Sequence, residues 1–163
     1  MKKTDKFLIG IVVGIVILIV AAFIITFTRP QATYQAEDTP QGVAHNYLLA
    51  LEKHEYERAY QYLSPTLKGY PDSPSKFASD IENNAYRFRF EKATRLQVLT
   101  TEKFTDKTVV KVQKSYFRSG GLFDSEQSIT TFEVDLMLEE GNWRIVDANQ
   151  YFAWCWKQET GCK

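Results

Sequence analysis

The chain has 163 residues, and its 20 basic residues balance its 20 acidic residues. The first six residues hold three lysines and one aspartate, so the rest of the chain carries a net charge near −2. This balance argues against nucleic acid and against strongly anionic surfaces as general partners. Aromatic residues make up 14% of the chain, which is too many for a disordered polypeptide.

Residues 7–27, FLIGIVVGIVILIVAAFIITF, contain no charged side chain and no polar face. At ~1.5 Å per residue, a helix of this length spans about 32 Å, the thickness of the hydrocarbon core of a bilayer. We therefore expect a transmembrane helix. The lysines of residues 1–6 predict a cytoplasmic tip. The expected product is a single-pass protein of the cell membrane, with its N-terminus in the cytoplasm and its C-terminal domain outside.

A cleaved signal peptide is the alternative, but the apolar run exceeds the usual ~7–15 residues and no A-x-A site follows it. Gly10 and Gly14 form a G-x-x-x-G pattern within the run. Small residues one turn apart let two helices approach closely, so these glycines are a candidate dimer face. The alternative is that they reflect only the frequency of glycine in membrane helices.

Residues 28–38 are mostly polar, and an early Arg-Pro pair disfavours helix, so we expect a short tether. Residues 39–163 suffice for one extracytoplasmic domain with a core. Thr39 is a good N-cap and Pro40 suits the first helical position, which predicts a helix running to about Lys53.

A second helix is expected over residues 56–63, where aromatic and apolar residues recur at helical spacing. Residues 68–75 carry glycine and prolines and predict a loop. Ser75 is then expected to cap a third helix that ends near Asn84. Two side chains of that helix are expected to face inward, Phe77 and Ile81.

From Tyr86 onward the apolar period changes from 3.6 to 2, which is typical of strands. This alternation predicts strands within residues 86–101, 110–116, 131–139 and 143–146, the last running on toward Trp154, with turns at 119–121 and 140–142. The fold class is therefore α+β, with about three helices packed on one side of an antiparallel sheet of four or more strands.

Three stretches of the chain carry a family resemblance: TPQGVAHNYLLAL from residue 39, HEYERAYQYLS from residue 54 and GNWRIV from residue 141. With this helix pair and final hairpin, residues 39–154 resemble the NTF2-like superfamily. The resemblance implies a curved sheet wrapped round a long helix, with a pocket inside the cone. Some members of that superfamily are isomerases or dehydratases, and many are non-catalytic binding modules, so the fold does not choose between them.

If the cone holds an open pocket, four residues are candidates to line it: Tyr47, Tyr60, Phe77 and Ile81. Tyrosines at helical spacing are more often part of a core, with the hydroxyl reaching its rim. Whether the pocket is open or filled therefore decides between a ligand site and a packed interior.

Candidate acid–base residues are few. His45 and His54 do not share a helix face, and we expect both to be solvated or to cap a helix end. Asp80 lies three residues after Phe77, but aspartate is rarely buried, so we expect it on the helix surface. The chain has no metalloprotease, serine-nucleophile, phosphate-loop or dinucleotide motif, so we assign no catalytic, metal or cofactor residue.

Basic residues interleave with Phe88 and Phe90 after the third helix; they are Arg87, Arg89, Lys92 and Arg95. Such interleaving can hold single-stranded nucleic acid. Outside the cell and in a near-neutral domain, we favour a solvated strand face.

The C-terminal segment has the most unusual composition outside the apolar run, with aromatic residues at positions 151, 152, 154 and 156. We expect this segment to fold over the sheet and fill the core; contact with the bilayer surface or with a partner is the alternative. In an oxidising compartment Cys155 and Cys162 are expected to form a short-loop disulfide, the alternative being two free thiols.

The expected function is a membrane-tethered, non-catalytic binding or interaction module for an envelope protein, a peptide or a lipid. A cavity enzyme of the isomerase or dehydratase class, using a buried carboxylate or histidine, is the second hypothesis. A structural protein that forms homodimers is the third. A carboxylate or histidine that points into an open pocket would favour the enzyme, whereas a pocket filled by tyrosine and phenylalanine would argue against it.

Overall fold

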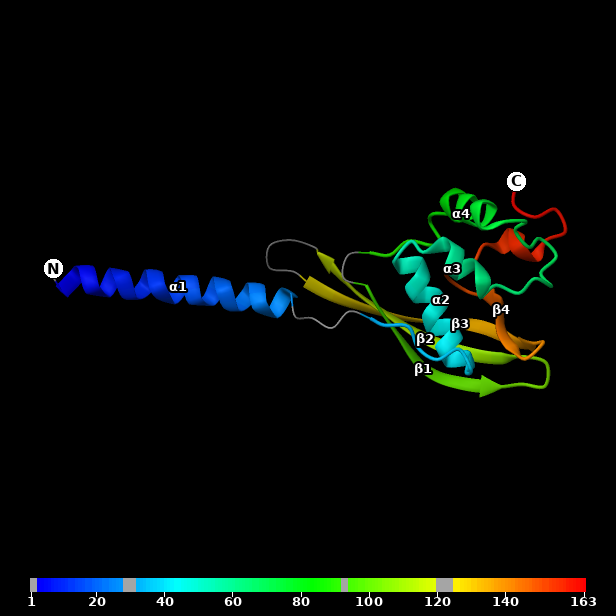
Figure 1. Ribbon diagram of the computed structural model, residues 1–163, viewed down its shortest axis with the longest axis horizontal. Coiled ribbons are helices and arrows are strands. Elements are labelled where there is room, and N and C mark those ends of the chain that lie inside the picture. Colours follow the sequence, from blue (N-terminus) through cyan, green and yellow to red (C-terminus); the bar gives the residue numbers. More distant parts are fainter. Residues whose placement is uncertain (1–2, 28–31, 92–93, 120–124) are drawn as a thin grey trace. The chain divides into compact units, whose positions relative to one another are not determined.

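The computed structural model describes residues 3–27, 32–91, 94–119 and 125–163, and the chain forms two compact units, 1–32 and 33–163. The first unit is one long helix, α1 (Lys3–Phe27; Figure 1). Its segment Phe7–Ile24 is apolar and long enough to cross a membrane, and none of it is buried. The expected apolar helix is therefore confirmed, while its insertion in a membrane stays a prediction.

The second unit begins its helical part with α2 (Pro40–Glu52) and α3 (Tyr56–Gln61). The hydroxyl of Thr39 accepts a hydrogen bond from the backbone N–H of Gly42 at 3.1 Å, and Pro40 occupies the first turn. This cap and the start of α2 are as the sequence predicts.

The third helix of this unit, α4 (Pro74–Asn83), begins two residues earlier than expected. Its cap is Ser73, whose hydroxyl accepts from the N–H of Lys76 at 3.1 Å; the prediction of Ser75 was wrong. Pro74 explains the difference, because proline lacks an N–H and has a preset φ, and so fits the first helical position.

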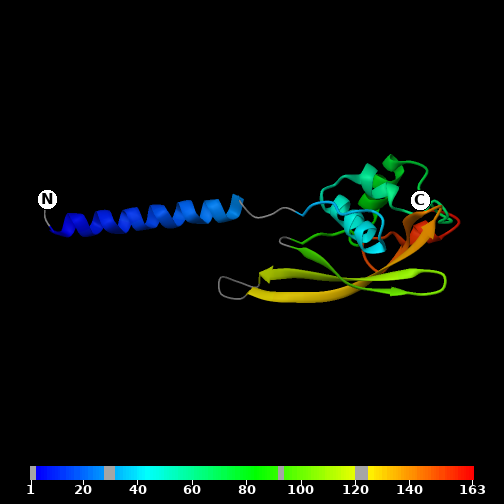
Figure 2. The same cartoon turned by 60° about the horizontal axis from the view of Figure 1, so that its bottom comes forward.

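Four antiparallel strands follow: β1 (Arg95–Lys103), β2 (Thr108–Ser119), β3 (Ser125–Glu139) and β4 (Asn142–Ala148). They pair in sequence order, and α2, α3 and α4 lie on one side of the sheet (Figure 2). The β3–β4 hairpin turns at Glu140 and Gly141, which both have positive φ, as two-residue hairpin turns require. The expected α+β class is confirmed. The predicted turn at 119–121 extends into residues outside those described.

Two predicted strand segments were wrong. Residues 86–90 form no strand: the chain turns at 84–88 after α4, where the N–H of Arg87 donates to Asn84 at 2.8 Å and that of Phe88 to Ala85 at 3.2 Å, and 89–90 are irregular. The alternation arises because Phe88 packs against the core while the arginines do not. The last strand also stops at Ala148 instead of continuing toward Trp154, since the backbone turns through positive φ at Tyr151.

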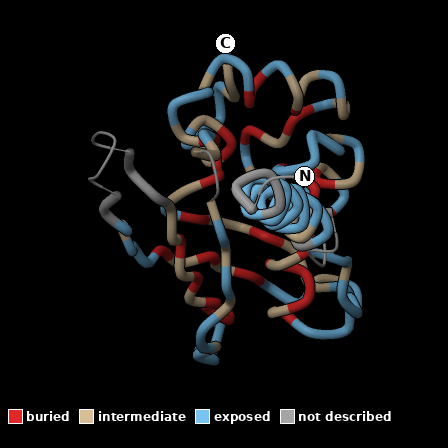
Figure 3. Tube along the Cα trace, turned by 90° about the vertical axis from the view of Figure 1, so that its left-hand side faces the viewer, coloured by how far each residue is buried: buried red, intermediate tan, exposed pale blue. Residues whose placement is uncertain are grey.

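The core between helices and sheet is filled by large aromatic side chains. Figure 3 marks the buried residues in red along the chain trace. Five aromatic side chains are buried almost completely: Tyr47, Phe77, Tyr151, Phe152 and Trp156. Trp156 lies in a short 3₁₀-helix, η1 (Trp154–Lys157), and its ring stacks on Phe77 with centroids 5.0 Å apart. The expectation that the C-terminal segment fills the core is confirmed, except that Trp154 is 58% exposed.

The two cysteines lie at disulfide distance, with Cα atoms 4.9 Å apart, as the sequence predicts. The loop that they close packs against two other segments. The N–H of Gly69 donates to the carbonyl of Trp156 at 3.0 Å, and Lys76 Nζ donates to the carbonyl of Cys162 at 2.8 Å. A disulfide here therefore fixes the end of the segment that fills the core.

Replacing both cysteines by serine should lower the free energy of unfolding by about 2–3 kcal/mol, because the unfolded chain gains the entropy of an open loop. Urea denaturation of the full chain in neutral-detergent micelles measures this change. Without reductant, the double serine variant should have the same free energy of unfolding as the native chain whose disulfide has been reduced. Equal stability of oxidised and reduced native chain would contradict the role given to the disulfide.

Candidate functional site

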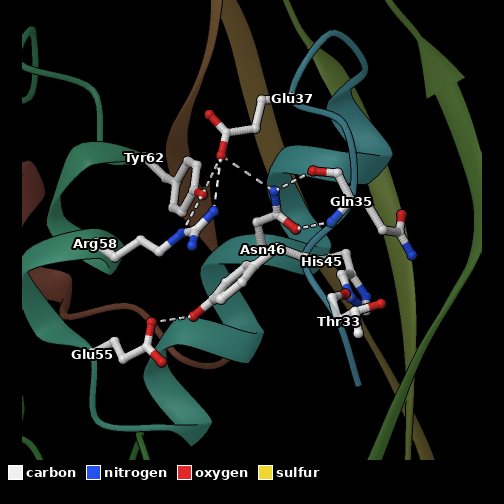
Figure 4. Close-up of polar contacts among 9 residues, drawn as sticks. Thr33, Gln35, Glu37, His45, Asn46, Glu55, Arg58 and Tyr62 are labelled. Atoms are coloured by element: carbon white, nitrogen blue, oxygen red, sulfur yellow. Dashed lines mark hydrogen bonds and ion pairs between the residues drawn. The ribbon is translucent and has the colours of Figure 1, made fainter. Parts of the chain in front are cut away.

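The segment Thr33–Asp38, here called the N-terminal segment, lies against α2 and α3 (Figure 4). Asn46 of α2 has no exposed surface, and its amide satisfies both backbone groups of Gln35. Asn46 Oδ1 accepts from the N–H of Gln35 at 2.7 Å, and Nδ2 donates to its carbonyl at 2.9 Å. The side chain thus pairs with this backbone much as a neighbouring strand would.

Gly42 brings the same segment close to the first turn of α2. A Cβ atom at position 42 would overlap the carbonyl oxygen of Ala36, so only glycine permits this approach. Residues 33–38 of the predicted tether therefore pack as part of the domain. Of the remaining tether residues, 28–31 lie outside the described residues.

A cluster of charged and phenolic groups joins the N-terminal segment to α3. The guanidinium of Arg58 lies over the ring of Tyr34, 3.3 Å from its centroid, and donates to Tyr62 at 3.1 Å and to Glu37 at 3.4 Å. The hydroxyl of Tyr62 donates to Glu37 at 2.6 Å, and that of Tyr34 donates to Glu55 at 2.5 Å. Burial and the bond to Glu55 raise the pKa of Tyr34 to about 12, so its phenol remains a donor at neutral pH.

Two hollows open beside this cluster and share Glu37, Gln61 and Tyr62. The first, here called the Trp143 cleft, has a volume of about 380 Å³ and lies between α3 and the start of β4. The second has about 600 Å³ and includes Arg58 and His54. The residues that give the Trp143 cleft its chemistry are Glu37, Tyr60, Tyr62, Tyr70, Trp143 and Arg144.

The Trp143 cleft combines aromatic surface with one charge of each sign. Tyr60 and Tyr70 pack with ring centroids 5.1 Å apart, and the hydroxyl of Tyr60 donates to the carbonyl of Pro71 at 2.9 Å. Arg144 donates to the backbone carbonyl of Gln61, which fixes its guanidinium beside the cleft. Such a surface can stack on planar groups and pair with polar groups of either charge.

The candidate pocket residues do not gather in one site. Tyr60 lines the Trp143 cleft, and Ile81 lines a different hollow near Phe88 and Phe90. Tyr47 and Phe77 have no exposed surface and belong to the core. The hydroxyl of Tyr47 donates to the carbonyl of Tyr151 at 2.6 Å, and burial raises the pKa of this phenol.

Asp80 is buried, with 1% of its surface exposed, so the expectation of a surface position was wrong. Its Oδ2 accepts from Nε1 of Trp156 at 2.9 Å, and its Oδ1 pairs with Lys76 at 2.5 Å. The spacing from Phe77 places both residues on the inward face of α4, which is the signal that the sequence did offer. Its partners give the carboxylate a structural role beneath Trp156.

The histidines are separate, as expected. His45 Nε2 lies 3.0 Å from the carbonyl of Thr33, while His54 is exposed between α2 and α3, 2.9 Å from the hydroxyl of Tyr56. Sequence reasoning missed the N-terminal segment and the two charged groups that it uses, Glu37 and Arg58. The one local signal for the segment was Asn46, a polar residue between the apolar residues of α2.

No family model matches this chain, and no curated protein matches it in sequence. Solved structures resemble it at low identity. A SEC-C motif containing protein from Rhodopseudomonas palustris is 13% identical, with a TM-score of 0.47 over 72% of this chain and 83% of that one. An NTF-2 like protein of unknown function from Shewanella oneidensis is 7% identical, with a TM-score of 0.43 over 65% of this chain and 90% of that one. At these values neither likeness bears on function.

Replacing Asn46 by leucine should release the N-terminal segment while leaving the core packed, because leucine has a similar volume but cannot bond to Gln35. The backbone N–H of Gln35 should then exchange with deuterium at least about tenfold faster, as expected for a loss of ~1.4 kcal/mol. Hydrogen exchange followed by mass spectrometry measures this rate. Gln41→Leu, on the same helix, should leave it unchanged; equal exchange in native chain and N46L would contradict the pairing.

Proposed function

We propose that this chain is a single-pass membrane protein whose extracytoplasmic, NTF2-like domain is a non-catalytic binding module. Its ligand would be a peptide segment of another envelope protein, held in the Trp143 cleft. The observation that carries the proposal is the contrast between a solid aromatic interior and an open aromatic cleft at the surface. Recognition can therefore use the surface while the interior serves only stability.

The packed interior disfavours the cavity enzyme. Such an enzyme needs a carboxylate or histidine that a substrate can reach. Asp80 is the buried carboxylate of α4, and it is occupied by Lys76 and Trp156. His45 and His54 lie at the protein surface, each beside a different polar partner. No geometry among the described residues brings one of these groups to an open interior pocket.

A peptide suits the Trp143 cleft better than a lipid tail does. Trp143 and the tyrosines offer flat faces for side chains, Arg144 can pair with an acidic residue, and Glu37 can pair with a basic one. Tryptophan, tyrosine and arginine are also the residues that most often dominate protein interfaces. A purely apolar ligand would remove water from Glu37 and Arg144 and give them no new polar partner in return.

The homodimer through Gly10 and Gly14 stays a prediction. Among the described residues, and apart from the backbone of the helix itself, no atom lies within 4 Å of a Cβ built at either glycine, so both offer the close approach that a second helix would need. This contact would add to the binding role and would not replace it.

Membrane anchoring and orientation are tested by fractionation and protease protection of the full chain in its native cell type. The chain should stay in the membrane pellet after extraction at alkaline pH, because α1 is embedded in hydrocarbon. Protease added to wall-stripped intact cells should remove the domain. A full-length chain that resists this protease until the cells are lysed, or that is washed off by alkali, would contradict the proposal.

The binding role is tested by affinity capture from native membranes with the full chain and two tryptophan variants. Trp143→Ala should lose at least about tenfold of the captured partner, or about 1.4 kcal/mol, because it removes the largest face of the cleft. Trp154→Ala removes a tryptophan that is exposed outside the cleft and should capture the partner as the native chain does. Equal loss in both variants, or in neither, would contradict peptide binding in the cleft.

A further inference from the structure

A third hollow, of about 490 Å³, lies apart from the Trp143 cleft and shares no residue with it. Segments distant in sequence form it: the turns after α4, strand β2 and the residues that follow β4. Three of its lining residues are basic and one is acidic. The full lining is Tyr86, Arg87, Arg89, Glu91, Lys114, Asn149 and Gln150.

The backbone that carries the two arginines is fixed by hydrogen bonds and by the packing of Phe88. The N–H of Tyr151 donates to the carbonyl of Arg87 at 3.1 Å. The carbonyl of Arg89 accepts from Lys114 Nζ at 3.3 Å and from the hydroxyl of Tyr151 at 3.4 Å. Phe88, between the arginines, is buried against Trp156. The two guanidinium groups therefore project from a preorganised turn, which lowers the entropy cost of binding.

Lys114 and Glu91 neutralise each other. Lys114 is 7% exposed, and its Nζ lies 2.8 Å from Glu91 Oε2. Burial alone would lower the pKa of Lys114, but the bonds to Glu91 and Tyr151 outweigh burial and raise it. Burial likewise works to raise the pKa of Glu91, but the bond to Lys114 and the other favourable contacts lower it. Both groups stay charged at neutral pH, so their pair adds no net charge to the hollow.

Arg87 and Arg89 lack a direct ion pair within the described chain, although Arg89 lies near enough to Glu91 to help lower the pKa of that carboxyl. Neither forms an ion pair with any carboxylate that the structure describes. Arg87 Nε is shielded from solvent, and within the described part of the chain it has no hydrogen-bond acceptor. Glu52, Glu82 and His54 face the neighbouring hollow that shares Arg89, but none of them makes such a bond with it. A buried donor without an acceptor costs ~1–3 kcal/mol.

We propose that the hollow lined by Arg87, Arg89 and Lys114, here called the Arg87–Arg89 hollow, binds a phosphate group. Two guanidinium forks match the several oxygens of a phosphate, and the side-chain amides of Asn149 and Gln150 at the same hollow offer further donors. The site is local: it accommodates one phosphate and gives the near-neutral domain no general affinity for anionic surfaces.

The phosphate can belong to a membrane lipid or to a small soluble molecule. The lipid source rests on the proposed anchoring. If α1 spans the membrane, residues 28–32 alone separate its apolar run from the domain, and five extended residues reach at most ~18 Å. A lipid headgroup is then always present at high local concentration.

The test uses the full chain in neutral-detergent micelles, titrated with inorganic phosphate at constant ionic strength in a calorimeter. The native chain should show saturable binding. Arg87→Gln/Arg89→Gln should bind at least about tenfold more weakly, or ~1.4 kcal/mol. Arg95→Gln/Lys103→Gln removes the same charge from exposed positions on β1 and should bind as the native chain does. Circular dichroism in the near ultraviolet checks that each variant is folded; Arg89→Gln alone serves if the double variant is not.

Absence of saturable binding by the native chain, or equal weakening by the two double variants, would overturn the site. A second titration separates the sources, with micelles that contain phosphatidylglycerol or phosphatidylcholine. Competition by phosphatidylglycerol supports a lipid headgroup as the ligand, whereas undiminished binding of inorganic phosphate supports a soluble one. Because this site shares no residue with the Trp143 cleft, its failure would leave the proposed peptide binding intact, and the reverse also holds.

Discussion

The packing of Trp156 against α4 is the contact on which the rest of the domain depends. The indole stacks on Phe77, bonds to Asp80 through Nε1 and is surrounded by Phe88 and Phe152. It thereby joins the C-terminal segment to α4, whose Asp80 lies 76 positions earlier in the sequence. Each such aromatic side chain contributes on the order of 2–3 kcal/mol by leaving water. The buried carboxylate is tolerable only because Trp156 and Lys76 satisfy it.

This packing decides where ligands can bind. A sheet with helices on one face has an interior that could hold a small molecule, but here Tyr47, Tyr151 and Trp156 occupy that space. The open hollows lie at the rim, where Trp143 and Arg144 meet α3 and where Arg87 and Arg89 meet β2.

The sequence predicts the elements whose cause is local. Thr39 and Pro40 mark the start of α2, and the alternation around Phe132 and Val134 marks β3, because capping and side-chain period depend on neighbours in the chain. The strand expected at Phe88 failed since alternation can also arise when two residues of a turn reach a core. The prediction that Asp80 lies on the surface failed because its partner, Trp156, lies far away in sequence. The site residues Glu37 and Arg58 are brought together only by tertiary packing, so no local pattern could reveal them.

The N-terminal segment contributes Glu37 to the Trp143 cleft. Glu37 lines the cleft, yet the same carboxylate accepts from Tyr62 and Arg58 and so helps to hold the segment on α3. A ligand that pairs with Glu37 must compete with these two donors. The free energy that the ligand gains by pairing with Glu37 is offset by weaker attachment of the segment. The offset is smaller if the ligand also accepts a hydrogen bond from Tyr62. By linkage, the factor by which the ligand weakens attachment of the segment equals the factor by which release of the segment raises the affinity for the ligand. Under the proposed function, binding in the cleft and attachment of residues 33–38 are therefore two coupled equilibria.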